Sequence, residues 1–469
     1  MLGSWRVNRR HRTATVRERT SLRTDYGRSP TAHLRGVPIA CHARNVRPPT
    51  RRILFALLLA GIALHWPSRI NAQAGTQKKL QIDSFEFVWT TIRDKHWETR
   101  PGGLDWDAIH EEYRPQMEAA TTSDQARSVI RAMLARLHET HFAIFPAGVA
   151  EDIANDEGDG TPGFDVRVLD GHVIVTDVFG DEAVHTGWEL IRSGAWDIQT
   201  LLAKLQADPA INEYALVRAI QSRLTGVTGT EKHYVFEDGG RARLERNLRL
   251  KTPRGELATF GNLTSQHVWF ESRKNGNTGI IRLTEFLDLP RIIPAFGKAI
   301  QECAQCDGLI IDIRGNPGGI GGMAMGMAGW LIDRANQRLG TMYMRGATLN
   351  FIVNPRANAY TGPVAILVDG TSASTSEIFA GGLQDLHRAR IFGTRTAGAA
   401  LPSVITRLPN GDGFQYAVAN YISAGGRALE GNGVTPDVQV KLTREGLLEG
   451  HDSILDAALQ WIHQQRRQP

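Results

Sequence analysis

The pattern of apolar and polar positions along the chain changes near residues 150 and 265. Between residues 76 and 142, apolar side chains recur every three or four positions, which predicts amphipathic helices. Pro101-Gly102-Gly103 interrupts the first run, and Thr122-Ser123-Asp124 is typical of a helix start. We therefore expect a helical N-terminal segment over residues 75–150. The apolar positions that carry this prediction are Ile82, Phe85, Phe87, Val88, Ile92, Ile130, Met133, Leu134 and Leu137.

A polar stretch over residues 151–163 leads into short alternating runs, which favour β-strands. Residues 164–168 and 172–175 flank the turn Asp170-Gly171, and residues 234–236 and 242–248 add two further strands. Residues 198–205 have helical spacing. These runs predict a small α+β module over residues 160–251, which is an ordinary size for a domain.

From residue 265 onward, strands alternate with helices, which indicates an α/β sheet. Residues 308–314 and Val364–Val368 are almost continuously apolar, as strands buried on both faces are. A glycine-bearing turn follows each of them and leads to a helix, expected over residues 323–332 and over 374–386. The fold class is therefore multidomain α/β, with an α/β domain over 265–445 and a last helix within 446–469.

The overall charge of +5 hides a strong asymmetry. Residues 1–52 contain 13 Arg and only two acids, Glu18 and Asp25, a local charge of +11. Subtracting it leaves −6 for residues 53–469, so the bulk of the protein is mildly acidic. A nucleic-acid partner is therefore not expected.

Residues 51–74 have the order of a secretory signal. Arg51-Arg52 precede the apolar run 53–64, and Asn71-Ala72-Gln73-Ala74 supplies small residues for cleavage after Ala74. The apolar run is too short to span a bilayer as a stable helix, although an uncleaved anchor is the alternative. We expect a signal peptide at 53–74 and a periplasmic or secreted protein without a stable membrane anchor. Residues 1–52 are then a basic leader, for which we favour an over-extended translation start over a disordered basic arm.

The chain has three cysteines, and Cys41 lies in the leader. The other two, Cys303 and Cys306, follow the expected signal peptide. Their C-x-x-C spacing fits a disulfide in an oxidising compartment. Two half-buried thiols one helical turn apart are the alternative, which we favour. No second Cys or His pair accompanies them, so a zinc site is not expected there.

Ser374 follows a buried strand and a glycine turn, and it stands at the expected start of a helix. Free N–H groups and the helix dipole favour negative charge there, as a nucleophilic serine requires. Ser372 and Ser376 are competing nucleophiles. Ser374-x-x-Glu377 also fits a capping box, in which the serine has only a structural role.

The turn Arg314–Gly319 ends the neighbouring buried strand. Its glycines allow the backbone to approach a ligand closely, although a plain tight turn is equally compatible. A nucleophilic serine also needs a base. His141 and, three residues earlier, His138 are candidates, although a lone histidine is more often structural. Glu430 is suited to orient a histidine or to lie as a solvated surface carboxylate.

Three blocks, Gly308–Gly319, Thr371–Asp385 and Glu430–Asp437, resemble the signature blocks of the C-terminal-processing and tricorn-type serine peptidases of family S41. The segment before them resembles that family's helical N-terminal cap, and the middle module, with Gly187–Ile191, resembles a divergent PDZ domain. The resemblance implies a ClpP/crotonase-like α/β catalytic domain, a polypeptide substrate and no cofactor.

The resemblance also implies roles for individual residues. The nucleophile falls on Ser374, and the oxyanion donors fall on the backbone of Thr375, Gly318 and Gly319. Processing proteases of the family use a lysine base, but Ala399 holds that position here. No Lys lies between Lys298 and Lys441.

The tricorn-type branch instead uses a histidine from the N-terminal segment and a glutamate near the C-terminus. Thr140-His141 is similar to its Ser-His pair, and Glu430 matches its glutamate. The implied reaction is acyl transfer, in which His141 takes the proton of Ser374 while Thr140 and Glu430 orient the histidine.

The resemblance implies that the PDZ-like module binds substrate tails by strand addition. Two alternatives to an exported endopeptidase stay open. One is a non-catalytic protein that binds peptide or an apolar ligand on the same fold, and the other is a hydrolase of non-peptide esters. The oligomeric state is unknown.

Overall fold

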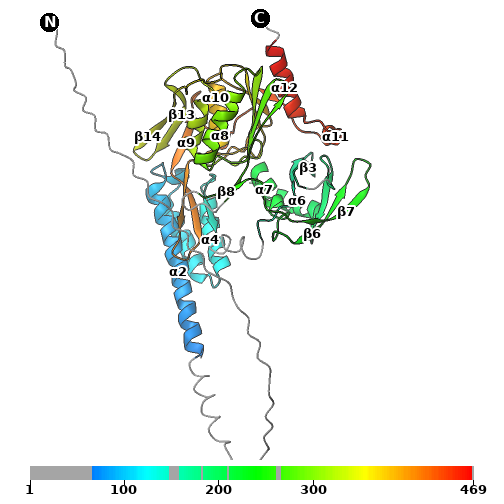
Figure 1. Ribbon diagram of the computed structural model, residues 1–469. Coiled ribbons are helices and arrows are strands. Elements are labelled where there is room, and N and C mark those ends of the chain that lie inside the picture. Colours follow the sequence, from blue (N-terminus) through cyan, green and yellow to red (C-terminus); the bar gives the residue numbers. More distant parts are fainter. Residues whose placement is uncertain (1–65, 147–157, 181–182, 209–210, 260–265, 467–469) are drawn as a thin grey trace, which may run out of the picture. The chain divides into compact units, whose positions relative to one another are not determined.

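The computed structural model describes residues 66–146, 158–180, 183–208, 211–259 and 266–466 (Figure 1). The basic leader at 1–52, with Cys41, and the apolar part of the expected signal peptide lie outside these residues. Helix α2 (Trp66–Lys95) runs across the expected cleavage site after Ala74. None of the helices in these ranges has the length and apolar character needed to cross a membrane.

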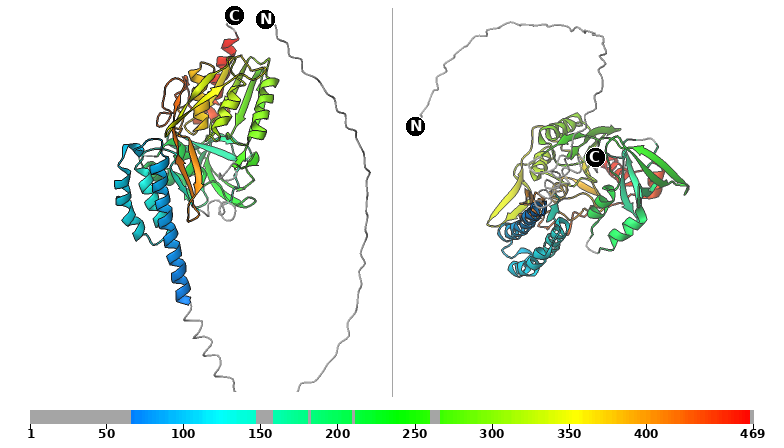
Figure 2. Two further views of the ribbon diagram at one scale, coloured as in Figure 1. Left: turned by 90° about the vertical axis from the view of Figure 1, so that its left-hand side faces the viewer. Right: turned by 90° about the horizontal axis from the view of Figure 1, so that it is seen from below.

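Helices form the N-terminal segment, as the periodicity predicts. After α2 come a 3-10 turn (Pro101–Gly103), α3 (Trp106–Ala119) and α4 (Ser123–Ala135), and Thr122 caps α4 with a capping box. Strand β1 (Ala143–Phe145) then pairs antiparallel with β18 (Gly413–Ala417), far along the chain. The strands around residue 415 lie beside the N-terminal helices (Figures 1 and 2). Leu408 and Phe414 complete the core of these helices.

The middle module is an antiparallel sheet with two helices. Its strand order is β2-β3-β4-β6-β7, with the short β5 paired to β4. The helices are α6 (Ile198–Gln206) and α7 (Glu213–Gln221), and α7 is an element that the sequence pattern did not reveal. The strands are β2 (Phe164–Leu169), β3 (His172–Val178), β4 (Glu189–Ser193), β5 (Trp196–Asp197), β6 (Glu231–Glu237) and β7 (Arg243–Arg249).

The α/β domain is built on a six-stranded sheet in the order β10-β11-β12-β15-β16-β20. All neighbours pair in parallel except β10 with β11. This confirms the mixed α/β, multidomain fold class. The strands are β10 (Phe270–Asn275), β11 (Thr278–Leu283), β12 (Gly308–Asp312), β15 (Val364–Val368), β16 (Arg390–Gly393) and β20 (Val438–Gln439).

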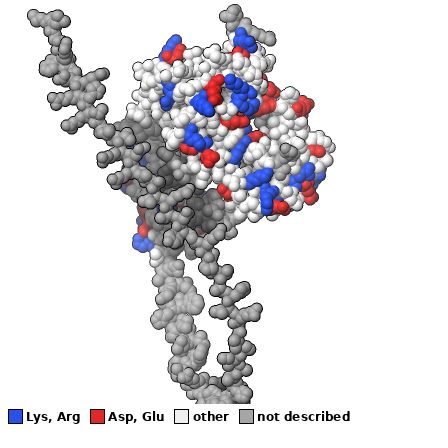
Figure 3. Space-filling view, viewed as in Figure 1, with Lys and Arg blue, Asp and Glu red and all other residues white. Residues whose placement is uncertain are grey.

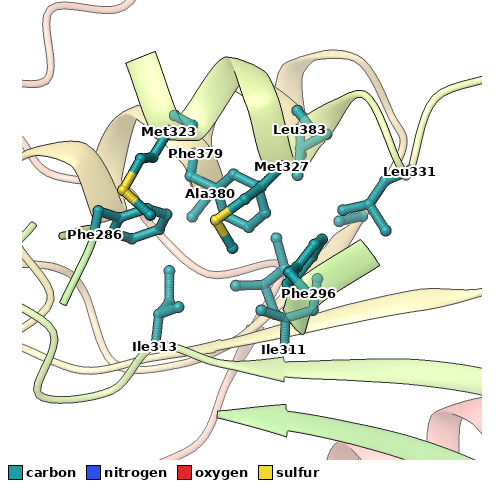
Figure 4. Packing of buried hydrophobic residues seen from close by; sticks show 14 of the residues in the cluster. Phe286, Phe296, Ile311, Ile313, Met323, Met327, Leu331, Phe379, Ala380 and Leu383 are labelled. Carbon is teal, nitrogen blue, oxygen red and sulfur yellow. The ribbon is translucent and has the colours of Figure 1, made fainter. Parts of the chain in front are cut away.

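Helices cover both faces of this sheet. Ile311 and Ile313 point to one face, where they meet side chains such as Met327 and Phe379 of α9 (Gly321–Ala328) and α10 (Thr375–Asp385) (Figure 4). Helix α8 (Leu289–Glu302) contributes to the same core. Ile310 belongs to the core on the other face, with α12 (Ser453–Gln465), because successive strand residues alternate between faces. The short α11 (Arg444–Leu448) precedes α12.

Further strands extend beyond the main sheet. Strands β13 (Gln337–Met344), β14 (Ala347–Val353) and β19 (Ala419–Ser423) form a second sheet, and β17 (Ser403–Arg407) pairs with β18. Strands β8 (Glu256–Ala258) and β9 (Gln266–Val268) form a small ribbon. Over the face shown in Figure 3, basic and acidic side chains lie intermixed.

Cys303 and Cys306 form a disulfide and are both buried, so our preference for two free thiols was wrong. Helix α8 ends at Glu302, and a tight turn follows in which the N–H of Cys306 donates to the oxygen of Cys303. The turn holds the two Cα atoms 4.8 Å apart, which is within the range that a disulfide spans.

Candidate active site

Ser374 is the N-cap of α10, immediately after the turn that follows β15. It forms the capping box with Glu377, whose carboxylate accepts a hydrogen bond from the N–H of Ser374 at 2.9 Å. N-cap residues normally have extended backbone angles, but Ser374 has φ 55° and ψ −117°. Such a conformation costs about 1–3 kcal/mol in a residue with a side chain and is typical of functional sites. A capping role does not require it.

The three serines of this turn have different surroundings. The hydroxyl of Ser372 is buried and donates to the oxygen of Ile313 at 2.8 Å. The hydroxyl of Ser376 is also buried and donates to the oxygen of Asn316 at 2.9 Å. Ser374 alone among residues 371–383 is not fully buried. Ser374 is therefore the serine that a substrate can reach, while Ser372 and Ser376 stabilise the turn.

The glycine turn after β12 packs directly against Ser374. Gly318 has φ 100°, and a Cβ placed on it would lie 2.7 Å from the Cβ of Ser374 and 2.8 Å from the nitrogen of Thr375. Gly319, with φ 134°, lies against the main chain of Phe286 in the same way. Side chains at either position would collide with backbone, so here glycine is required both by conformation and by space.

Backbone N–H groups beside Ser374 differ in their partners. The N–H of Gly318 donates to Oδ1 of Asn316 at 2.9 Å and is therefore engaged. Within the described residues, the N–H groups of Gly319 and Thr375 have no hydrogen-bond partner. Thr375 stands at the first position of α10, where the N–H has no acceptor within the helix. These two groups are thus available to an oxyanion.

Glu377 does more than complete a capping box, and the sequence reasoning missed this. It is fully buried, and its two oxygens accept hydrogen bonds from Ser374, from the hydroxyl of Thr396 and from the N–H groups of Gly398 and Ala399. Burial raises the pKa of this carboxyl to about 7, while the four donors act in the opposite direction. Glu377 therefore fixes the backbone of Ser374 to the loop around Ala399.

Thr140, His141 and Glu430 form a continuous chain of hydrogen bonds. The N–H and the hydroxyl of Thr140 lie 2.8 and 2.9 Å from the two carboxylate oxygens of Glu430, to which they donate. Nδ1 of His141 lies 2.7 Å from the same hydroxyl. A hydroxyl has one proton, and Glu430 accepts it, so Nδ1 of His141 is the donor in the second bond. This assigns the tautomer in which Nε2 of His141 is unprotonated.

Burial lowers the pKa of His141 to about 4, so its imidazole is neutral at neutral pH. The pKa of Glu430 is raised, chiefly by burial, and the donors from Thr140 and Ala400 counteract this. His138 is exposed and takes no part in this chain.

Two adjacent residues of one loop connect the serine to the histidine chain. The oxygen of Ala399 accepts from the N–H of Ser374 at 2.8 Å, and the N–H of Ala400 donates to Glu430 at 2.9 Å. Among the described residues, no hydrogen bond joins His141 to Ser374 itself. In unliganded enzymes such contacts are often long and tighten when substrate binds.

The lysines that flank this region lie in ion pairs elsewhere. Lys441 pairs with Asp170 at 2.6 Å, and Lys298 lies 3.6 Å from Glu302. Ala399 stands where the resemblance to processing proteases predicts a lysine, and its main chain is hydrogen-bonded to both Ser374 and Glu377.

Comparison with known proteins gives two matching family models. Residues 277–440 match peptidase family S41, and residues 83–135 match the tricorn protease C1 domain. The first of these contains Ser374, the glycine turn and Glu430.

Several curated proteins are similar in sequence. The chloroplastic carboxyl-terminal-processing peptidase 3 of Arabidopsis thaliana is 24% identical over 364 residues, which cover 75% of this chain and 67% of the relative. A carboxy-terminal-processing protease of Bartonella bacilliformis is 31% identical over 193 residues, 39% of this chain and 43% of the relative. A probable CtpA-like serine protease of Staphylococcus epidermidis is 29% identical over 180 residues, 36% of this chain and 35% of the relative. The matched stretches thus span from about a third to two thirds of these relatives.

Solved structures show the same fold at lower identity. A photosystem II D1 C-terminal processing protease has a TM-score of 0.52 at 20% identity, covering 81% of this chain and 98% of its own. Mature CPAF has a TM-score of 0.56 at 15% identity, covering 82% of this chain and 97% of its own.

Proposed function

Because this chain carries a peptidase family S41 domain and a tricorn C1 domain, we propose that it is an exported serine endopeptidase that hydrolyses peptide bonds. Ser374 is the nucleophile, His141 is the base, and Thr140 and Glu430 support the base. The observation that carries this proposal is the bonded chain from Glu430 through Thr140 to His141, which leaves Nε2 unprotonated.

In this mechanism the hydroxyl of Ser374 attacks the scissile carbonyl carbon while Nε2 of His141 takes its proton. The resulting oxyanion accepts hydrogen bonds from the N–H groups of Gly319 and Thr375. The amine leaves with the proton from His141, and water then attacks the acyl-enzyme by the same path in reverse. Gly318 contributes by close packing, because its own N–H is held by Asn316.

Polypeptides are the proposed substrates, and the middle module is the proposed PDZ-like element. Strand addition would take place at β2, an edge strand of its sheet. At Val166, however, the N–H donates to Asp165 and the oxygen accepts from Arg167, both at 2.9 Å. A peptide that adds along β2 must therefore displace these two side chains.

Export to the periplasm or the exterior is proposed from the order of charged, apolar and small residues over 51–74. The Cys303–Cys306 disulfide supports the proposal, because structural disulfides persist mainly in oxidising compartments.

A second candidate is a peptide-binding protein without catalysis, and the missing hydrogen bond between His141 and Ser374 favours it. Hydrolysis separates the two. Residues 75–469 are incubated with an unfolded polypeptide such as β-casein, and the new N-termini are sequenced. We expect cleavage by the unaltered protein and none by Ser374→Ala. Binding of casein without cleavage by either protein would support the second candidate.

A further inference from the structure

His96 is a fully buried histidine that the proposed reaction does not use. It follows the last residue of α2, and its N–H continues the helix by donating to the oxygen of Ile92. Nδ1 of His96 accepts from the N–H of Glu98 at 3.1 Å. A ring nitrogen that accepts a hydrogen bond carries no proton, so the proton of this imidazole is on Nε2.

The protonated nitrogen of His96 faces the segment that contains the proposed base. Nε2 donates to Oε2 of Glu139 at 3.0 Å. Immediately after the proposed base in sequence comes Phe142. Its ring stacks with the ring of His96, at 5.9 Å between centroids and 16° between planes. His96 thus contacts the residue before Thr140 and the residue after His141.

This segment has a backbone that needs external support. His138 and His141 both have positive φ, 54° and 62°, and neither is a glycine. Residues in that conformation cost about 1–3 kcal/mol each and persist only where surrounding contacts enforce them. Glu430 supplies such contacts at Thr140, and His96 supplies them at Glu139 and Phe142.

The loop that contains His96 is itself anchored from a distant part of the chain. Arg345, at the tip of the β13–β14 hairpin, donates to the oxygen of His96 at 2.9 Å and to the oxygen of Glu98 at 2.7 Å. The ring of Trp97 stacks on the imidazole at 3.8 Å between centroids. The imidazole is therefore also held by contacts outside the segment at 139–142.

We propose that His96 is a positioning residue of the active site: its imidazole holds Glu139 and Phe142 and thereby keeps His141 oriented on Thr140 and Glu430. This rests on the proposed peptidase function. If His96 only filled the core, its substitution would lower the fraction of folded molecules. The rate constant of the molecules that remain folded would not change.

Two substitutions of His96 distinguish a positioning role from a purely structural one. Both remove the ring, and they differ in which ring nitrogen's hydrogen bond they keep. His96→Gln places an amide N–H near the position of Nε2 and keeps a donor to Glu139, whereas His96→Asn keeps an acceptor near the position of Nδ1 and loses that donor. A fluorophosphonate probe reports both the fraction of molecules that react at completion and the rate constant of the reaction. We expect the Asn variant to react to the same completion at least about tenfold more slowly, and the Gln variant to stay within about threefold of the unaltered protein.

Glu139 provides a second pair of variants, in a partly exposed loop where substitution is less disruptive to folding. Glu139→Gln keeps an acceptor for His96 and is expected to react at close to the normal rate, while Glu139→Ala is expected to react about tenfold more slowly. Normal rates in both His96→Asn and Glu139→Ala would overturn the proposal. Reduced completion with an unchanged rate constant in both would also overturn it, because that result describes a structural role. Failure of the unaltered protein to react would instead refute the proposed function.

Discussion

The proposed site has two halves that are built in different ways. The serine half comprises Ser374, the turn at Gly318 and Gly319, and Glu377, and it lies at the ends of neighbouring parallel strands. The histidine half comprises Thr140, His141 and Glu430, and its hydrogen bonds join residues 290 positions apart. The first half is enforced by main-chain packing and the second by a few side-chain contacts.

This difference determines how each half fails. In the serine half, positive φ values and main-chain contacts leave no room for even one added carbon. In the histidine half, the side-chain links are individual hydrogen bonds that a conservative substitution can keep or remove. Substitutions in the serine half should therefore damage both fold and reaction, whereas substitutions in the histidine half should slow the reaction and leave the fold intact.

Gly318→Ala is expected to have the largest effect. The added Cβ would collide with Ser374 and Thr375. Residue 318 also has φ 100°, a backbone conformation that is unfavourable for alanine. The collision displaces the N–H of Thr375, one of the two proposed oxyanion donors. We therefore expect fluorophosphonate labelling to slow by about 100- to 1,000-fold, with a lower melting temperature. Gly322→Ala is the matched control, because a Cβ there meets nothing within 4 Å. Equal labelling of both variants would contradict the packing argument.

Thr140→Val tests the histidine half at constant shape. The methyl group replaces the hydroxyl that links His141 to Glu430, so the tautomer of His141 is no longer fixed. We expect the labelling rate to fall about 100-fold with little change in melting temperature. Thr140→Ser keeps the hydroxyl and should label at nearly the normal rate. A valine variant as fast as the serine variant would remove Thr140 from the mechanism.

The two halves should also titrate differently. Burial lowers the pKa of His141 to about 4 and raises that of Glu377 to about 7. As the pH falls, we expect a shallow decrease in labelling rate near pH 7 and a loss of about tenfold or more near pH 4, measured while tryptophan fluorescence reports folding. Between pH 6.5 and 4 the unfolded chain binds a proton at residue 141 that the folded chain does not, so the contribution of His141 to stability decreases as the pH falls. The raised pKa of Glu377 contributes with the opposite sign between about pH 4.5 and 7. A single loss centred at pH 6.5 would contradict the buried, neutral imidazole.

Glu285→Gln should have the smallest effect on the reaction and a measurable effect on stability. Burial raises the pKa of Glu285 to about 7, partly opposed by Arg218, and no described residue forms a hydrogen bond with its side chain. The folded state then binds a proton more tightly than the unfolded state, so stability is lost as the pH rises from about 4.5 to 7. The glutamine variant should be more stable by about 1–2 kcal/mol at pH 8 and unchanged near pH 4.5, by urea denaturation. Glu256→Gln, at an exposed position, is the control, and an equal gain there would contradict the assignment.

The serine half could largely be predicted from sequence because its signals are local. Val364–Val368 forms the expected strand, and α10 begins and ends within one residue of the expected helix. Two contacts could not be read from local patterns. Asn316 accepts the hydrogen bond from the N–H of Gly318, and Glu377 accepts hydrogen bonds from the loop at 396–399. Both contacts depend on the direction of a side chain in the folded protein.

The histidine half could not be derived from local pattern. Thr140 and Glu430 meet only after folding, and a family resemblance alone suggested pairing them. The elements that position this half were also missed. Strands β17 and β18 are short and half-buried, and β14 is mostly exposed, so none has the continuous apolar run of a core strand.

The central claim is that Ser374 is the nucleophile and that a neutral His141 is its general base. The most direct test is to treat the protein with a fluorophosphonate and to locate the adduct by peptide mass spectrometry. We predict one adduct, on Ser374, absent from Ser374→Ala and formed far more slowly in His141→Ala. An adduct on Ser372 or Ser376, or equal labelling of all three proteins, would contradict the account.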